Sequence, residues 1–406
     1  MKVDKIKWRT VRLGSVIKFI SGGTPSISEP RYWNGKIPWV SSAEMTQGRI
    51  WNTERRVTED GADNGTKRVP AKTVLIVVRG MSLAKEFRVA ITIREVTFNQ
   101  DLKALIPSEY VDAEFLYYYL LSQNGPIRDS ASEAAHGTKK LDMQVIEQWP
   151  LLLPPLLIQK KIAAILSTYD DLIENNKRRI ALLEKMAEEI YREWFVRMRF
   201  PGHEKVKFKK GLPVSWDVKR LGDILELAYG KALKESDRTQ GNFPVYGSGG
   251  VIGSHNKFLA GGPGIIIGRK GNVGSVHWSD LDFFPIDTVY YVKSNLSKYY
   301  LYYLLQSMNF INNDAAVPGL NRSQAYSNQL YFPGRSLIEE FADLVKNMFC
   351  QKSSLLKKNE HLKISTNMLL SRLISGKLSV EDIDIHFPPS MQNEQDVDHA
   401  QLHLRK

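Results

Sequence analysis

The stretch from Asp170 to Arg197 constrains the fold most, because its residues follow the spacing of a seam between two helices. A stripe of alternating four- and three-residue steps, with Glu and Lys between, is narrow and needs a partner helix. The residues that form it are Asn176, Ile180, Leu183, Ala187, Ile190 and Trp194. The spacing therefore predicts one long helix that stops before Pro201 and packs lengthwise on another helix.

The partner helix is predicted in the same chain. A single apolar stripe is also typical of an ordinary helix in a globular core, but two stripes in matching register favour pairing. Short connections make the pair antiparallel, and at about 1.5 Å per residue the first helix spans roughly 42 Å, the length of a spacer. The second seam repeats the spacing of the first at Leu355, Asn359, Leu362, Thr366, Leu369 and Leu373.

An internal repeat separates two globular segments. Residues 8–14 return as 216–222, and the aromatic run 115–118 returns as 300–303. Short β-branched runs bounded by Gly, Pro, Asn or Asp predict strands, among them 73–78 and 89–93, and an aromatic-rich helix is predicted in each copy, at 113–121 and 298–307. Neither copy alternates strands and helices regularly, so each is predicted as an α/β unit with a strongly twisted, partly closed sheet rather than a doubly wound one.

These observations predict an α+β chain with two similar α/β domains, separated by two long helices that form an antiparallel coiled coil with internal pseudo-two-fold symmetry. The expected segments are a first domain, a first helical spacer, a second domain, a second helical spacer and a polar C-terminal tail. Their predicted boundaries are 1–152, 153–200, 201–335, 336–384 and 385–406.

The net charge of +12 over 406 residues favours a polyanionic partner, with nucleic acid first among the candidates. Cys350 is the lone cysteine, which excludes an intramolecular disulfide and a thiolate metal cage and fits the cytoplasm. No run of 18 apolar residues is present, so no membrane span is predicted.

The sequence carries no recognisable catalytic motif. The stretch Gly261–Gly274 lacks the spacing of a phosphate-binding loop, and the eight histidines show no metal-ligand spacing. The NPPY and DPPY strings that hold a target base in DNA methyltransferases are absent, so the chain is predicted not to be an enzyme. The run Tyr117–Tyr119 could stack on bases, but its place on a predicted helix favours core packing.

Basic and amide side chains at predicted turns are the candidate DNA contacts. Repeat-equivalent positions carry more weight, since two related domains would meet DNA with the same edge: Arg79 matches Arg269, and Lys139-Lys140 matches Asn321-Arg322. Arg can read guanine and Asn adenine, while Lys mostly holds phosphates, but the sequence alone does not sort these roles. The candidate set is Arg31, Lys36, Arg79, Lys139, Lys140, Lys231, Arg269, Lys270, Asn272, Asn321 and Arg322.

Four stretches together resemble the specificity subunit of a type I DNA restriction-modification system. They are Ile20–Pro25, Ile37–Val40, Leu153–Pro155 and the helix LLEKMAEEIYREWFVRMRFPG. The resemblance extends to about Leu378 and is weakest where Pro333-Gly334-Arg335 replaces Pro154-Pro155-Leu156.

The resemblance implies a non-catalytic subunit whose two target recognition domains each read one half of a split DNA site while the helices set the spacer. It further implies that two methyltransferase subunits, which bind S-adenosylmethionine, and motor-nuclease restriction subunits carry out adenine methylation and cleavage. The chain itself would bind no cofactor. A stand-alone, two-headed DNA-binding regulator or architectural protein is the alternative, and copurification with a methyltransferase separates the two.

Overall fold

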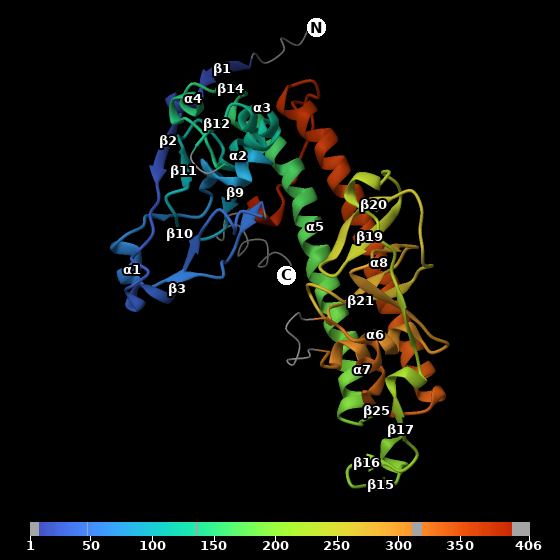
Figure 1. Cartoon of the computed structure of the whole chain (residues 1–406). Coiled ribbons are helices and arrows are strands. Elements are labelled where there is room, and N and C mark those ends of the chain that lie inside the picture. The colour runs from blue at the N-terminus through green and yellow to red at the C-terminus, as the bar shows by residue number, and fades with distance from the viewer. Residues whose placement is uncertain (1–7, 47, 135–136, 311–318, 392–406) are drawn as a thin grey trace, which may run out of the picture. The chain divides into compact units, whose positions relative to one another are not determined.

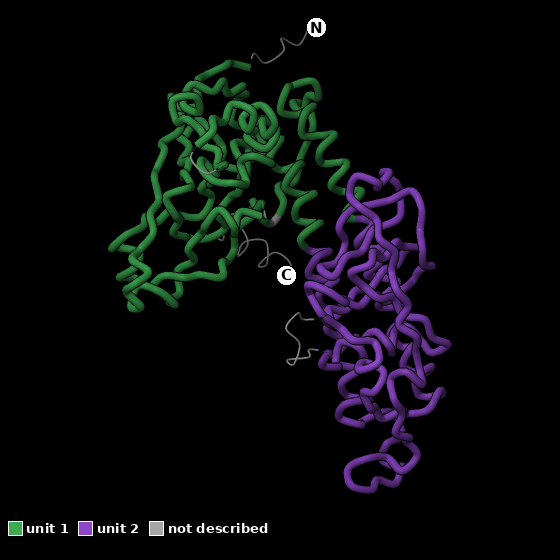
Figure 2. The backbone as a smooth tube through the Cα atoms, viewed as in Figure 1, with its two compact units in different colours: residues 1–174, 359–406 green, residues 175–358 purple. Residues whose placement is uncertain are grey.

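The computed structural model describes residues 8–46, 48–134, 137–310 and 319–391. The chain forms two compact units: unit 1 comprises residues 1–174 and 359–406, and unit 2 comprises residues 175–358 (Figure 2). Two long helices, α5 (Leu156–Tyr191) and α8 (Arg335–Ile374), contribute a segment to each unit. Each unit therefore consists of one globular part and part of both helices.

Unit 1 is built on a five-stranded sheet in which two of the inner strands, β7 and β9, are buried along their whole length. Neighbouring strands are antiparallel, except that the short β4 runs parallel to β9. The strands predicted at 73–78 and 89–93 are confirmed to within one residue at each end. Across the sheet the order is β2 (Ile17–Ser21), β11 (Leu102–Pro107), β7 (Val74–Val77), β9 (Val89–Thr92) and β4 (Arg49–Ile50).

Two smaller sheets and a two-stranded clasp accompany it in unit 1 (Figure 1). The four-stranded sheet has the order β5 (Arg56–Val57), β3 (Trp33–Val40), β10 (Val96–Phe98) and β6 (Arg68–Val69). The three-stranded sheet has the order β12 (Ser132–Glu133), β13 (Lys139–Lys140) and β8 (Arg79–Gly80). The clasp pairs β1 (Arg9–Arg12) with β14 (Pro150–Leu153).

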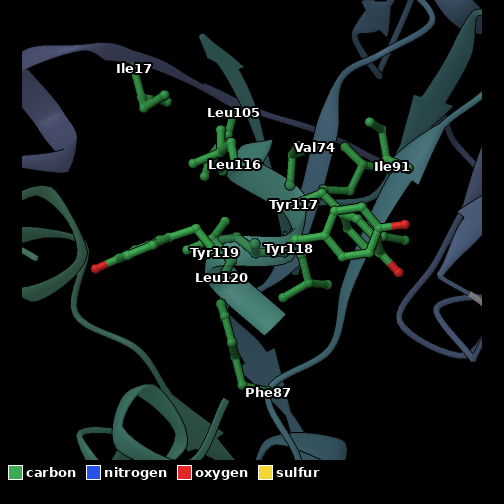
Figure 3. Packing of buried hydrophobic residues seen from close by; sticks show 14 of the residues in the cluster. Ile17, Val74, Phe87, Ile91, Leu105, Leu116, Tyr117, Tyr118, Tyr119 and Leu120 are labelled. Carbon is green, nitrogen blue, oxygen red and sulfur yellow. The ribbon is translucent and has the colours of Figure 1, made fainter. Parts of the chain in front are cut away.

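Helix α2 (Ala113–Ser122) packs on β7, β9 and β11 of unit 1. Asp112 caps it, because its carboxylate accepts a hydrogen bond from the Phe115 amide at 2.9 Å. Tyr117, Tyr118 and Tyr119 are all buried, and Figure 3 shows the Tyr119 side chain pointing away from the other two. Core packing is thus confirmed for these tyrosines. The remaining short helices of the unit are α1 (Glu59–Asp63), α3 (Asn124–Asp129) and α4 (Met143–Glu147).

Unit 2 repeats this plan with fewer strands among its described residues. Its main sheet is antiparallel throughout, with the order β18 (Glu226–Tyr229), β24 (Val289–Lys293), β21 (Gly264–Gly268) and β22 (Val276–Ser279). A second sheet has the order β20 (Gly250–His255), β19 (Phe243–Gly247) and β23 (Phe284–Pro285). The other elements are the hairpin β15 (Phe208–Lys209) and β16 (Leu212–Pro213), the clasp β17 (Asp217–Arg220) and β25 (Gln329–Phe332), and helices α6 (Lys298–Ser307) and α7 (Arg322–Ser327).

The repeated Leu-Gly pair has the same structural role in both units. Leu13 and Leu221 are fully buried at the end of the clasp, and each amide donates a 2.9 Å hydrogen bond across it. The following glycines are needed for space: a Cβ at Gly14 would lie 3.0 Å from Cβ of Glu147, and one at Gly222 would lie 2.9 Å from Cβ of Tyr326. The internal repeat is therefore a repeat of structure.

The two long helices run antiparallel, as predicted. In unit 1 the early part of α5, including Ile162, shares a core with Leu373 near the end of α8. In unit 2 the late part of α5, including Tyr191, shares a core with Phe341 near the start of α8. Both helices are longer than the seams indicated, since α5 begins at Leu156 and α8 at Arg335, and α5 continues into a π-helical turn at Arg192–Val196.

The predicted seam residues of both helices have buried or half-buried side chains, while most positions between them are exposed. Asn176 and Asn359 are among the buried ones. In unit 2, Nζ of Lys352 lies 2.6 Å from Oε1 of Glu184, so these two residues are level with each other on the paired helices.

The chain does not leave unit 1 after α8. Lys161 Nζ donates hydrogen bonds to the carbonyl oxygens of Val380 and Glu381, at 3.3 and 2.8 Å. Ile385 and Met391 pack against the core of unit 1. Residues 385–391 of the predicted polar tail are therefore docked, and residues 392–406 lie outside the described part of the chain. No helix within the described ranges is both long and apolar enough to cross a membrane.

Candidate nucleic-acid interface

In unit 1 the structure brings together three of the predicted DNA-contact residues. Strand β8 follows the buried β7, and its pairing with β13 places Arg79 opposite Lys140 and Gly80 opposite Lys139. Arg79 and Lys140 are exposed, and Lys139 is half-buried. Residues about 60 positions apart in the chain thus form one basic patch, which the sequence alone does not predict.

The charges of this patch point to an anion. Like charges directly opposite each other on neighbouring strands are destabilising, and Arg79 faces Lys140 in the ladder. Glu133, which pairs with Lys139 on the other side, is the acidic residue of the sheet. A phosphate backbone would offset the repulsion between Arg79 and Lys140.

Arg31 and Lys36 lie elsewhere in unit 1. Arg31 precedes β3, where it stacks over the Tyr32 ring at 5.2 Å and pairs with Glu29 at 3.4 Å. Lys36 is exposed on β3 itself. Neither lines the hollow of about 450 Å³ at the start of β3, whose lining includes Ile27, Trp33, Asn34, Arg55 and Arg56.

In unit 2, Arg269 and Lys270 follow the buried strand β21, but the strand register corrects the predicted match by one residue: Arg269 stands where unit 1 has Val78, and Lys270 where it has Arg79. Both amides donate hydrogen bonds to the Thr288 carbonyl, at 2.9 and 3.1 Å, and Lys270 forms a β-bridge with Gly319. This bridge is the counterpart of the pairing between Arg79 and Lys140 in unit 1, because the next residue donates the same backbone hydrogen bond in each unit, Leu141 to Val78 and Leu320 to Arg269. The predicted match of Lys139-Lys140 with Asn321-Arg322 is therefore wrong: Gly319 stands at the place of Lys140, and Asn321 caps α7 as Asp142 caps α4.

Two guanidinium groups meet over one ring in unit 2. The Cζ atom of Arg269 lies 5.1 Å from the ring centre of Tyr229, and that of Arg322 lies 5.0 Å from it. Tyr290 packs edge-on against Tyr229 at 5.0 Å, and its hydroxyl donates to the Leu320 carbonyl at 3.3 Å. Burial and the Tyr229 hydroxyl raise the pKa of Tyr290, which keeps it a neutral donor beside the two cations.

The other predicted contacts of unit 2 have different roles or none visible. Asn321 is the N-cap of α7: its amide oxygen accepts hydrogen bonds from the amides of Ser323 and Gln324, at 2.9 and 3.3 Å. That oxygen is therefore not free to read a base. Lys231 and Asn272 are exposed on loops.

Sequence reasoning missed Tyr229 and its counterpart in unit 1. Tyr229 is one aromatic residue at the end of a strand, and the arginines that pack on it lie far along the chain. In the first copy the equivalent register pairs Ser21 with Lys103, and Lys103 Nζ donates to Ser21 Oγ. The repeat itself could have drawn attention to this difference, since Ser21-Gly22 aligns with Tyr229-Gly230.

The described residues contain no group of three or more His, Cys, Asp or Glu side chains able to hold a metal ion. What the two patches offer is positive charge, hydrogen-bond donors and an aromatic face. These groups suit binding to nucleic acid.

The family model of the type I restriction modification DNA specificity domain matches residues 5–185 and 213–333. These two matches cover most of the chain and both globular parts. The chain belongs to this family. A specificity subunit recognises DNA sequence and is not itself catalytic, so the expected family, fold class and non-enzymatic role are confirmed.

Curated relatives and a solved structure agree with this assignment. The type I restriction enzyme MjaIX specificity subunit of Methanocaldococcus jannaschii is 26% identical over 93% of this chain and 94% of its own. The EcoR124I/EcoR124II specificity subunit of Escherichia coli is 31% identical over 50% of this chain and 51% of its own. A crystal structure of the type I S subunit from M. genitalium covers 92% of this chain and 97% of its own, with a TM-score of 0.58 at 19% identity, and so shares the fold.

Proposed function

We propose that each unit of this specificity subunit reads one half of a bipartite double-stranded DNA site, and that the paired helices set the distance between the halves. The single observation that carries the proposal is that both units present basic side chains directly after the same buried strand of the repeated fold, Arg79 in unit 1 and Arg269-Lys270 in unit 2. A second cation lies beside each, Lys140 opposite Arg79 and Arg322 over the ring that Arg269 also contacts. Two similar basic edges in one chain are suited to two DNA segments.

The chemistry would belong to partner subunits. A specificity subunit directs a methyltransferase, so we propose assembly with two methyltransferase subunits that bind S-adenosylmethionine and with restriction subunits that cut. The repeat supports the pair of methyltransferases, because each unit presents a similar segment of both long helices. We place the complex in the cytoplasm, because its DNA substrate is found there and because the reducing conditions there suit a lone cysteine.

The proposal is tested by mapping methylated sites in DNA from cells that express the chain with its methyltransferase partner. The wild type should give a site of two fixed halves around an unread gap. Arg79→Ala should relax base preference in one half, and Arg269→Ala should relax it in the other. An equal change in both halves from either substitution contradicts the proposal, and DNA binding without any methyltransferase partner would favour a stand-alone regulator.

A further inference from the structure

The second unit contains a cluster of two arginines and two tyrosines whose chemistry is unmatched in the first. Tyr229 is 49% exposed at the end of β18, and Tyr290 is directly across from it on β24. Arg269 arrives from the end of β21 and Arg322 from the start of α7. Three separate segments thus converge on one half-exposed ring.

The ring fixes the two guanidinium groups. Both are half-buried, and each lies within the roughly 6 Å of the Tyr229 centre at which a cation is attracted to an aromatic face. Arg269 Nη1 donates to the Asp287 carbonyl at 3.0 Å, which holds its plane further. A guanidinium held in one orientation loses less freedom when it forms a pair of hydrogen bonds with a base.

Their charge is left without an acidic partner. Within the described ranges, neither Arg269 nor Arg322 forms an ion pair with a carboxylate, although the two cations share one ring. Like charges held together at a surface favour an anion or an array of acceptors as the missing partner. The edge of guanine in the major groove offers two acceptors that match the arginine fork.

The first unit differs at the same register. Ser21 and Lys103 stand where unit 2 has Tyr229 and Tyr290, and the lysine is bonded to the serine. An ammonium is a compact point charge without the planar fork, so this site suits a phosphate more than a base edge. The two units therefore share a backbone frame but present different groups on it.

Resting on the proposed function, we infer that Tyr229 is a positioning residue for specificity, which holds Arg269 and Arg322 for bases in the half-site read by unit 2. Its ring acts through the arginines. Tyr229→Phe keeps the face on which they stack, whereas Tyr229→Ala removes it. The loss should broaden base preference by about tenfold at the positions read by the two arginines, because one bidentate contact is worth that order of discrimination.

The test maps methylated sites for the chain assembled with its methyltransferase partner. Tyr229→Ala and Arg269→Lys should broaden preference in a single half-site and leave the other half unchanged. Tyr229→Phe should match the wild type. Tyr331→Ala is the control, since Tyr331 is an equally exposed tyrosine, 48%, on β25 of the same unit.

Unchanged preference in Tyr229→Ala would overturn the inference. So would weaker methylation at every sequence with preference intact, which would make the cluster a phosphate anchor. If Tyr229→Ala lowers the melting temperature so far that no complex forms, Arg269→Lys decides, because it keeps the charge and loses only the fork. A wild-type map without two halves would overturn the proposed function, and this inference with it.

Discussion

Ser390 Oγ donates a 2.8 Å hydrogen bond to Asp171 Oδ2, although the two residues are 219 positions apart. Arg49 contacts the same carboxylate and donates to Ser390 Oγ at 3.3 Å. One carboxylate of α5 thus joins a strand of the main sheet to the last described turn of the chain. All three residues belong to unit 1, so the C-terminal segment closes the unit in which the chain began.

Removal of the C-terminal segment should lower the free energy of unfolding. Deleting residues from Ile385 onward removes two apolar contacts and leaves Asp171 without Ser390, so unfolding should become easier by about 2–4 kcal/mol. Base preference should persist. Deleting residues from Gln392 onward is the matched control and should leave the thermal unfolding curve unchanged. Equal melting temperatures for the two truncations would show that the docked segment contributes nothing.

Glu114 should make the stability of unit 1 depend on pH. Burial raises the pKa of this carboxyl to about 7, against the opposing charge of Arg49. A raised pKa means that the folded state holds the proton more tightly, so stability should fall as pH rises from about 4.5 to about 7. Glu114→Gln should remove this fall and stabilise the protein by roughly 3 kcal/mol at pH 8.

Denaturant unfolding of wild type and Glu114→Gln at pH 5 and pH 8 measures the effect. The two proteins should be similar at pH 5 and should diverge at pH 8, with the variant the more stable. A wild type that gains stability between these pH values relative to the variant would contradict the raised pKa.

Salt should distinguish phosphate contacts from other lysines. Lys140→Ala removes one charge from the exposed patch opposite Arg79, so the slope of log binding constant against log salt should become shallower by about one. Lys160, exposed on α5 in the same unit, is the control. An identical slope for Lys140→Ala and Lys160→Ala would remove Lys140 from the DNA interface.

Length of the helix pair should determine the gap in the recognised site. Glu184 and Lys352 are level, so seven residues inserted after Leu183 and seven after Lys352 add one heptad to both helices at the same height. The added length is about 10 Å, or roughly three base pairs. Methylation mapping should show both half-sites retained and a wider gap, whereas an unchanged gap with retained activity would mean that the helices do not set the distance.

Local patterns predicted the elements that are themselves local. The sequence predicts the strand at 73–78 and the helix at 298–307, because β-branched runs and aromatic spacing indicate a buried face directly. The beginning of α5 was not evident. Ile162, Ala163, Ala164 and Leu166 are all buried there, so this part of the helix lacks the narrow stripe that marks residues 176–194.

The hydrophobic pattern of the sequence does not predict contacts between distant segments. Ile385 and Met391 have no apolar period between them, and what buries them is a core made from the first half of the chain. The role of Tyr229 likewise depends on the register of β18 with β24 and on arginines of two other segments. The internal repeat predicts that a basic segment follows the same buried strand in both copies, but the match of Arg79 with Arg269 is off by one residue, and only the pairing of strands shows that Lys270 is the counterpart of Arg79.

The clasp has a consequence for how such proteins change over generations. In each copy of the internal repeat the globular segment begins on one strand, β1 or β17, and ends on its antiparallel neighbour, β14 or β25, just before a long helix. The first and last strands of each globular segment are therefore paired side by side, and the residues between them form one insert carried by the clasp. Recombination between genes that share the clasp and the helices could exchange a whole insert in one event, and a lineage could acquire a new half-site without rebuilding the rest of the protein.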